Sequence, residues 1–138
     1  MTGPSQRTEL RPNDASGLWL ATTEHGTKIW ISFDDRLWLR DSVGGPNPLP
    51  GDGRWRRLGW GPYLATWPQD GTRPRLTRSF GERGIRVGLA VSIGEGLDPA
   101  LHHWTTHVQS VEHVDEATLP YAARVDLARI KRSRREAE

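Results

Sequence analysis

The chain of 138 residues contains no cysteine and no long apolar segment. The absence of cysteine excludes disulfides and thiolate metal sites, and it favours a cytoplasmic location over a secreted one. No apolar run approaches the roughly 20 residues that a membrane-spanning helix needs. The first 17 residues are polar and hold no stretch typical of a signal peptide. We therefore expect a protein that has no membrane partner.

The sequence also lacks the common catalytic signatures. It has no glycine-rich phosphate loop ending in Lys-Ser or Lys-Thr, no dinucleotide fingerprint and no Gly-x-Ser-x-Gly elbow. Asp34 and Asp35 are adjacent carboxylates, but such pairs between two strands are typical of turns rather than of acid–base chemistry. We therefore expect no catalytic residues and no cofactor, and we interpret the protein as non-enzymatic.

Lysine is scarce, because 17 of the 19 basic residues are arginine. Arginine suits phosphate recognition, although a GC-rich gene would produce the same excess. Residues 124–138 hold six of the basic residues and three of the acidic ones, so the rest of the chain carries 13 basic against 14 acidic residues. The positive charge therefore belongs to the C-terminal segment.

Residues 1–16 are polar and lack periodicity, which predicts a disordered N-terminal arm. Three short runs at 18–22, 27–33 and 36–40 are rich in β-branched and aromatic residues and are joined by polar turns, which indicates a β-meander. The segment 44–53 has three prolines and four glycines and predicts a loop.

Two further strands are expected downstream of that loop. Residues 63–67 alternate weakly, and Ile85 to Ile93 alternate without a break, which makes this the strongest strand signal in the chain. We predict a mainly β fold: a small single domain over 17–118, built as a partly open β-barrel or sandwich of five to seven short antiparallel strands, with a C-terminal helix.

Four of the five histidines fall in LHHWTTHVQSVEH, residues 101–113. In a helix, His103 and His107 would stand at i and i+4, close enough to share a metal ion. In a strand, the same two residues lie roughly 13 Å apart and cannot. Helical spacing of apolar residues competes here with β-branched content, and we favour a helical turn at 98–103 followed by a strand at 104–114. We therefore expect no metal site, with His103 and His107 as candidates only if the segment is helical.

In a strand at 104–114, Val108 and Val111 would face opposite sides of the sheet unless a bulge intervenes.

Residues 119–138 form the basic C-terminal segment, which we expect to be helical. Pro120 suits a first helical turn, and Ala123, Leu127 and Ile130 make an apolar stripe at helical spacing. A strand using Ala123, Val125 and Leu127 is the alternative. The basic residues of this segment are candidates for nucleic-acid binding, or they serve only solubility and the helix dipole: Arg129, Lys131, Arg132, Arg134 and Arg135.

Aromatic and basic residues alternate in two places, around Trp38 and around Trp55. If Leu37 and Leu39 face the core, Trp38 and its neighbouring arginines lie outside, and Trp30 is likewise opposite to Ile29 and Ile31. The alternative is that the long loop or the C-terminal helix covers these tryptophans. The resulting candidate partner-binding residues are Trp30, Trp38, Arg36, Arg40, Arg54, Arg56 and Arg57.

Exposed tryptophan and arginine are the residues that dominate protein interfaces, and they also stack on nucleic-acid bases. We therefore expect an interaction module that binds another protein, or a second copy of itself, through this Trp/Arg face. Nucleic-acid binding through the same surface and the basic tail is the alternative. A metal-dependent enzyme built on residues 102–113 ranks below both.

Overall fold

The computed structural model describes residues 6–11, 15–41, 52–58, 65–67, 85–88, 90–94, 102–105 and 107–137. The strands are β1 (Gln6–Arg7), β2 (Glu9–Leu10), β3 (Leu18–Thr23), β4 (Lys28–Ser32), β5 (Leu37–Asp41), β6 (Arg56–Arg57), β7 (Ala65–Trp67), β8 (Ile85–Arg86), β9 (Ala90–Gly94), β10 (His102–Trp104) and β11 (Val108–His113). A 3₁₀ turn, η2 (Glu116–Thr118), leads into the helix α1 (Tyr121–Ala137).

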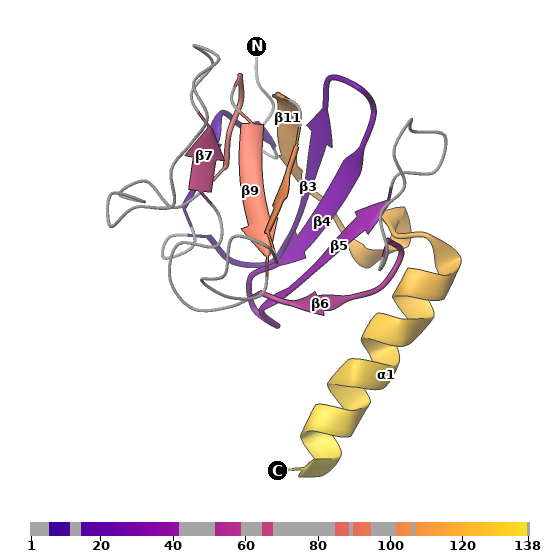
Figure 1. Cartoon of the computed structure of the whole chain (residues 1–138). Coiled ribbons are helices and arrows are strands. Elements are labelled where there is room, and N and C mark those ends of the chain that lie inside the picture. Colours follow the sequence, from indigo (N-terminus) through magenta and orange to yellow (C-terminus); the bar gives the residue numbers. More distant parts are fainter. Residues whose placement is uncertain are drawn as a thin grey trace.

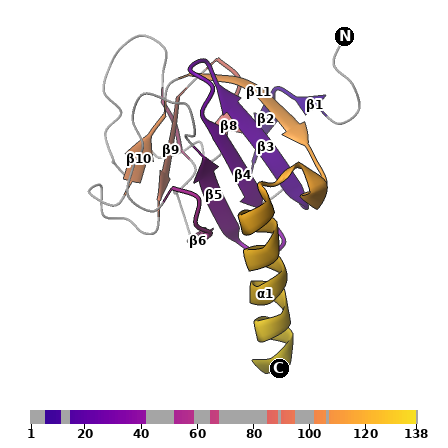
Figure 2. The same ribbon diagram turned by 90° about the vertical axis from the view of Figure 1, so that its right-hand side faces the viewer.

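The strands form three antiparallel sheets. The largest has the order β1-β11-β3-β4-β5-β6, and the smaller ones have the orders β10-β9-β7 and β2-β8 (Figures 1 and 2). The terminal strands β1 and β6 do not pair with each other, so the large sheet is open rather than closed into a barrel. The predicted mainly β, partly open architecture with a C-terminal helix is therefore confirmed. No helix among the described residues is long and apolar enough to cross a membrane.

The predicted meander is the centre of the large sheet. β3 pairs with β4 and β4 with β5 in the antiparallel sense, with Leu20 opposite Trp30 and Ile31 opposite Trp38. In the turn between β4 and β5, the Ser32 hydroxyl donates a hydrogen bond to the Asp35 carboxylate at 2.8 Å, and it accepts one from the Asp35 backbone N–H at 3.2 Å. Asp35 thus acts as a turn former, as its position predicts.

The N-terminal residues were predicted to be disordered, and this is wrong for residues 6–11. Strand β1 extends the large sheet along β11, whereas β2 pairs with β8, and the Thr8 carbonyl between them accepts a hydrogen bond from Val87. Leu10 is buried in the core at 1% exposure. Two-residue strands with one apolar side chain give no periodic signal, which is why the pattern missed them. Residues 1–5 and 12–14 lie outside the described residues.

The predicted continuous strand at 85–93 is divided into β8 and β9. Gly88 interrupts it with a φ of 94°, a conformation that glycine adopts without steric cost. β8 then pairs with β2, and β9 pairs with β7 and β10. Of the strand expected at 63–67, residues 65–67 form β7; residues 63 and 64 and the expected loop at 44–51 lie outside the described residues.

The histidine-rich segment is extended. The helical turn expected at 98–103 is wrong for His102 and His103, which belong to β10, while residues 98–101 lie outside the described residues. The strand expected at 104–114 is confirmed in part: Val108–His113 form β11 in the large sheet, whereas Trp104 ends β10 in another sheet. The register of β11 against β3 shifts between Val108 and Ser110, and this bulge lets Val108 and Val111 both reach the same core.

Both faces of the large sheet are covered by other elements. One face carries Trp19, Ile31 and Trp38 and packs with Leu10 and Ile85 from the small β2-β8 sheet. The other face lies under α1, whose Ala123, Leu127 and Ile130 form the predicted apolar stripe (Figure 2). The helix partners on the sheet are Leu18, Leu20, Trp30, Leu37 and Leu39. Helix, large sheet and small sheets therefore lie in successive layers.

Candidate interaction surface

The expected exposed tryptophan face is wrong. Trp30 is 2% exposed and Trp38 is 1% exposed. They also lie on opposite faces of the sheet, because Trp30 pairs with Leu39 under α1, whereas Trp38 pairs with Ile31 on the other side. The prediction assumed one buried face and one solvated face, and here both are buried. Neither indole is available to stack on a partner.

The arginines of the same predicted set differ in how far they are exposed. Arg40 forms an ion pair with Asp52, and the guanidinium of Arg56 lies 5.2 Å from the centroid of the Trp38 ring, so these two are engaged within the fold. Arg36, Arg54 and Arg57 are exposed. Arg57 pairs with Leu37, a residue of the helix-covered face, so it lies on the same side of the sheet as α1.

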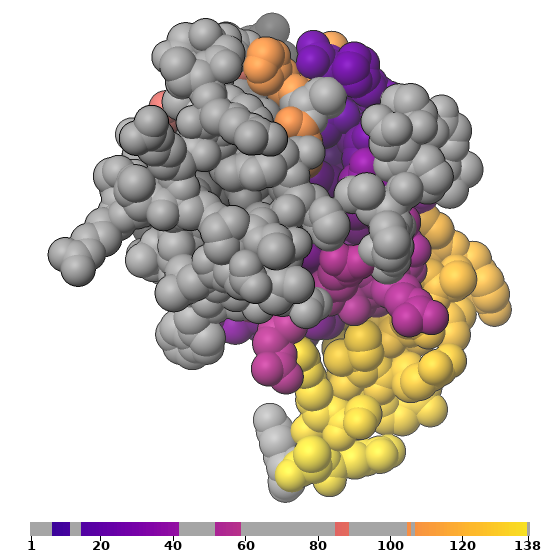
Figure 3. Space-filling view, viewed as in Figure 1, coloured from indigo at the N-terminus to yellow at the C-terminus, as the bar shows by residue number. Residues whose placement is uncertain are grey.

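Helix α1 is fixed to the sheet by polar contacts as well as by its apolar stripe. The Trp55 indole, next to β6, donates a hydrogen bond to the Ala123 carbonyl at 2.8 Å. Figure 3 shows the β6 segment and α1 side by side on one face of the molecule. No local pattern predicts this particular bond, since it joins residues 68 positions apart.

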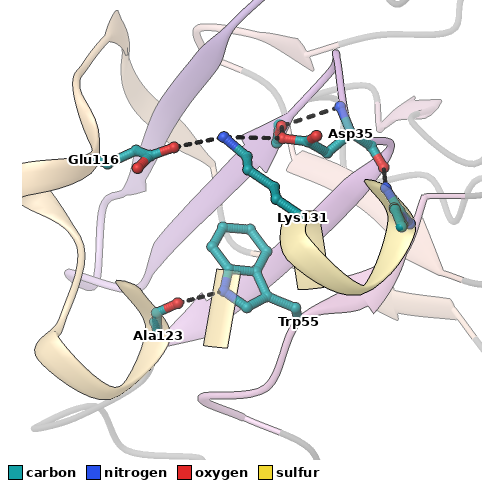
Figure 4. Close-up of polar contacts among 7 residues, drawn as sticks. Asp35, Trp55, Glu116, Ala123 and Lys131 are labelled. Carbon is teal, nitrogen blue, oxygen red and sulfur yellow. Dashed lines mark hydrogen bonds and ion pairs between the residues drawn. The ribbon is translucent and has the colours of Figure 1, made fainter. Parts of the chain in front are cut away.

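Further along the helix, Lys131 lies between two carboxylates (Figure 4). Its ammonium is 2.6 Å from Glu116 and 3.6 Å from Asp35. The hydrogen bond to Glu116, helped by the charge of Asp35, raises the pKa of Lys131. Arg134 also donates to the Asp35 carbonyl at 2.7 Å. Two of the five predicted tail residues, Lys131 and Arg134, thus anchor the helix.

The opposite side of α1 faces solvent and begins with apolar side chains. Among the described residues, two large apolar side chains are exposed, Tyr121 at 74% and Val125 at 39%. They stand four positions apart, one helical turn, so they share one face. The Arg124 guanidinium lies 5.7 Å from the centroid of the Tyr121 ring. We call the three residues the Tyr121 patch.

The outward side of α1 ends in arginine. Arg129, Arg132 and Arg135 are exposed and recur at intervals of three along the last turns. We call these three the arginine end of the helix.

The histidine-rich segment 101–113 has two histidines whose side chains the structure describes, one before β11 and one at its end. His107 is half-buried just before β11, and His113 ends that strand with its ring centroid 5.1 Å from that of Trp19. His103 belongs to β10, so the helical arrangement that would bring His103 and His107 to one ion is absent. Within the described ranges, no group of three or more histidine, aspartate or glutamate residues is placed to hold a metal.

Comparisons with protein-family models, with curated proteins and with solved structures find no significant match to this chain. The candidate surface therefore stands on its own geometry. Sequence reasoning identified the arginine end but missed the Tyr121 patch. A signal for it existed, because once Ala123 and Leu127 are assigned to the buried stripe, Tyr121 and Val125 must point away from it.

Proposed function

We propose that the protein is a non-enzymatic interaction module that binds a partner protein through the Tyr121 patch. The observation that supports this is the outward placement of Tyr121 and Val125 on one turn of α1. The other large apolar residues whose exposure the structure describes are buried or half-buried. A partner that covers the Tyr121 side chain gains free energy by removing its ring from water, because the residue is 74% exposed.

The chemistry of the patch specifies what a partner must offer. Tyrosine and arginine are enriched among the residues that dominate binding energy at protein interfaces. Arg124 beside the Tyr121 ring supplies a charge at the rim of an apolar contact. The complementary surface is an apolar pocket for the ring with a carboxylate at its edge.

Charge argues that the partner is a different protein rather than a second copy. The exposed residues of α1 include Arg124, Arg129, Arg132 and Arg135 against few carboxylates. Two copies facing each other through this helix would bring like charges together, which opposes association. A partner with an acidic rim gains from Arg124, which lies beside the Tyr121 ring, and does not need the arginine end.

The test is site-specific photocrosslinking in the native host. A photoreactive amino acid replaces Tyr121 in one variant and Gln109, an exposed residue of β11, in a matched control. We expect an adduct with one protein from position 121 alone, unchanged by nuclease treatment. The adduct protein is then purified, and its binding should weaken with Tyr121→Ser. Crosslinking from both positions alike, or full binding by Tyr121→Ser, would overturn the proposal.

A further inference from the structure

The arginine end of α1 is a second surface, separate from the Tyr121 patch. The apolar stripe stops at Ile130, and the following residues to 137 are charged or small. The helix nevertheless continues to Ala137 and extends past the edge of the sheet (Figures 1 and 2). Apolar packing against the sheet therefore does not account for the last turn, which contacts the β4–β5 turn through the Arg134 side chain.

The arginines of this end have little to hold them within the fold. No ion pair of Arg132 or Arg135 occurs among the described residues, and Arg129 meets Asp126 only at 3.6 Å with its side chain 72% exposed. Such an exposed contact contributes little. Lys131 and Arg134 contact Asp35 on the side of α1 that faces the sheet. The guanidinium groups of Arg129, Arg132 and Arg135 lie on the outward side and are available to a partner.

We infer that the arginine end of α1 binds duplex DNA, with the helix entering the major groove and its arginines contacting phosphates. An α-helix with side chains is about 10–12 Å wide, and the major groove of B-DNA is about 12 Å wide. Extension of the helix past the sheet is what such an approach requires. Guanidinium groups match phosphate oxygens bidentately, and contacts of this kind carry no sequence information.

The structure favours a duplex over a single strand. Single-strand binders stack bases on exposed aromatic rings beside their basic groups. The exposed ring of Tyr121 lies about two to four helical turns away from the arginine end. Of the tryptophans whose side chains are described, Trp19, Trp30 and Trp38 are buried, and Trp55 is half-buried with its N–H bonded to Ala123. Double-stranded RNA is also a poor fit, because its major groove is deep and narrow. This inference uses neither Tyr121 nor Val125, so it stands or falls separately from the proposed function.

The experiment measures binding of the full, untagged chain to a fluorescent 20-base-pair DNA duplex of mixed sequence at several salt concentrations. We expect a Kd of about 1–100 μM at physiological salt, as for sequence-independent binding. Arg132→Gln with Arg135→Gln should weaken binding and reduce the slope of log K against log salt by about 2, since each phosphate contact contributes roughly 0.9. The control, Arg11→Gln with Lys28→Gln, removes two exposed positive charges elsewhere and should leave the slope unchanged.

Three comparison ligands complete the test. The single strand, an RNA duplex and polyglutamate of equal charge should each bind more weakly than the DNA duplex. Equal binding of polyglutamate would assign the surface to acidic proteins, and equal binding of either of the other two would overturn the choice of DNA duplex. If the arginine variant melts at a lower temperature but binds DNA like the wild type, these residues serve only the helix dipole and the inference is wrong.

Discussion

The indole N–H of Trp30 donates a hydrogen bond to the Thr118 hydroxyl at 3.3 Å. This contact joins the middle of the large sheet to the turn that leads into α1, and it places Trp30 in the core between sheet and helix. Trp30 is therefore a structural residue.

Substitution of Trp30 should consequently act on stability. We expect Trp30→Ala to lower the free energy of unfolding by about 3–5 kcal/mol, as for other buried aromatic residues, and Trp30→Phe to cost less because most of the ring volume remains. Urea denaturation followed by circular dichroism measures both. A stable Trp30→Ala variant with weakened partner binding would support the exposed-face interpretation instead.

The two faces of α1 should respond differently to truncation. Leu127 is 1% exposed in the sheet–helix core, so Leu127→Ala should cost about 2–5 kcal/mol. Val125 lies outside at 39% exposure, and Val125→Ala should change stability by about 0.5 kcal/mol or less. The pair forms a matched comparison in one denaturation experiment, and equal effects would show that the helix does not dock through this stripe.

Gly17 is confined by both its backbone and its neighbour. Its φ is 83°, and a Cβ there would come within 2.7 Å of the His113 Nε2. Gly26 has a φ of 85° but no atom within 4 Å of its Cβ position. Gly26→Ala should therefore show only the left-handed penalty of about 1–2 kcal/mol, and Gly17→Ala should show more.

The additional loss of stability expected for Gly17→Ala can be tested by removing the His113 side chain. Measured relative to His113→Ala alone, which itself loses the contact with Trp19, Gly17→Ala should then cost about as much stability as Gly26→Ala, as judged by thermal denaturation. An equal effect of the two glycine substitutions in the wild-type background would contradict the close approach of His113.

The Lys131 anchor predicts a dependence on alkaline pH. The pKa of Lys131 is raised above its ordinary value of 10.5 in the folded protein, mainly by Glu116. Below that ordinary value both folded and unfolded states hold the proton, so the ion pair contributes fully; the contribution disappears as pH rises through the folded pKa.

The measurement that checks this is the difference in unfolding free energy between wild type and Lys131→Gln across pH. The difference should be about 0.2–1 kcal/mol at neutral pH, because the side chains of Lys131 and Glu116 are 39% and 49% exposed, and it should shrink above pH 10.5 and in high salt. A difference that grows with pH would show that another residue is responsible.

The sequence predicts the elements whose signals are local, and it misses those that depend on pairing between distant segments. Alternation identified β3, β4 and β5, and the spacing of Ala123, Leu127 and Ile130 identified α1, because these signals are local. The tiny strands β1 and β2 and the break at Gly88 depend on pairing with distant segments and left no local pattern.

The error at the tryptophans has a different origin. The tight turn at Asp34 and Asp35 already implied an antiparallel register, and that register places Trp30 and Trp38 on opposite faces. In that register the two tryptophans cannot both lie on one exposed face. That α1 covers one face, by contrast, depends on tertiary packing, which alternation within a strand does not encode.

Binding of a partner protein through the Tyr121 patch is tested most directly at Tyr121 itself. Because Tyr121 is 74% exposed, Tyr121→Ala should leave the unfolding free energy within about 0.5 kcal/mol of the wild type. The deciding measurement is the affinity of this folded variant for the crosslinked partner by isothermal titration calorimetry, with Gln109→Ala as control. We predict a Kd at least about tenfold weaker for Tyr121→Ala and unchanged for Gln109→Ala. An unchanged Kd for Tyr121→Ala would show that the partner does not bind through the Tyr121 patch.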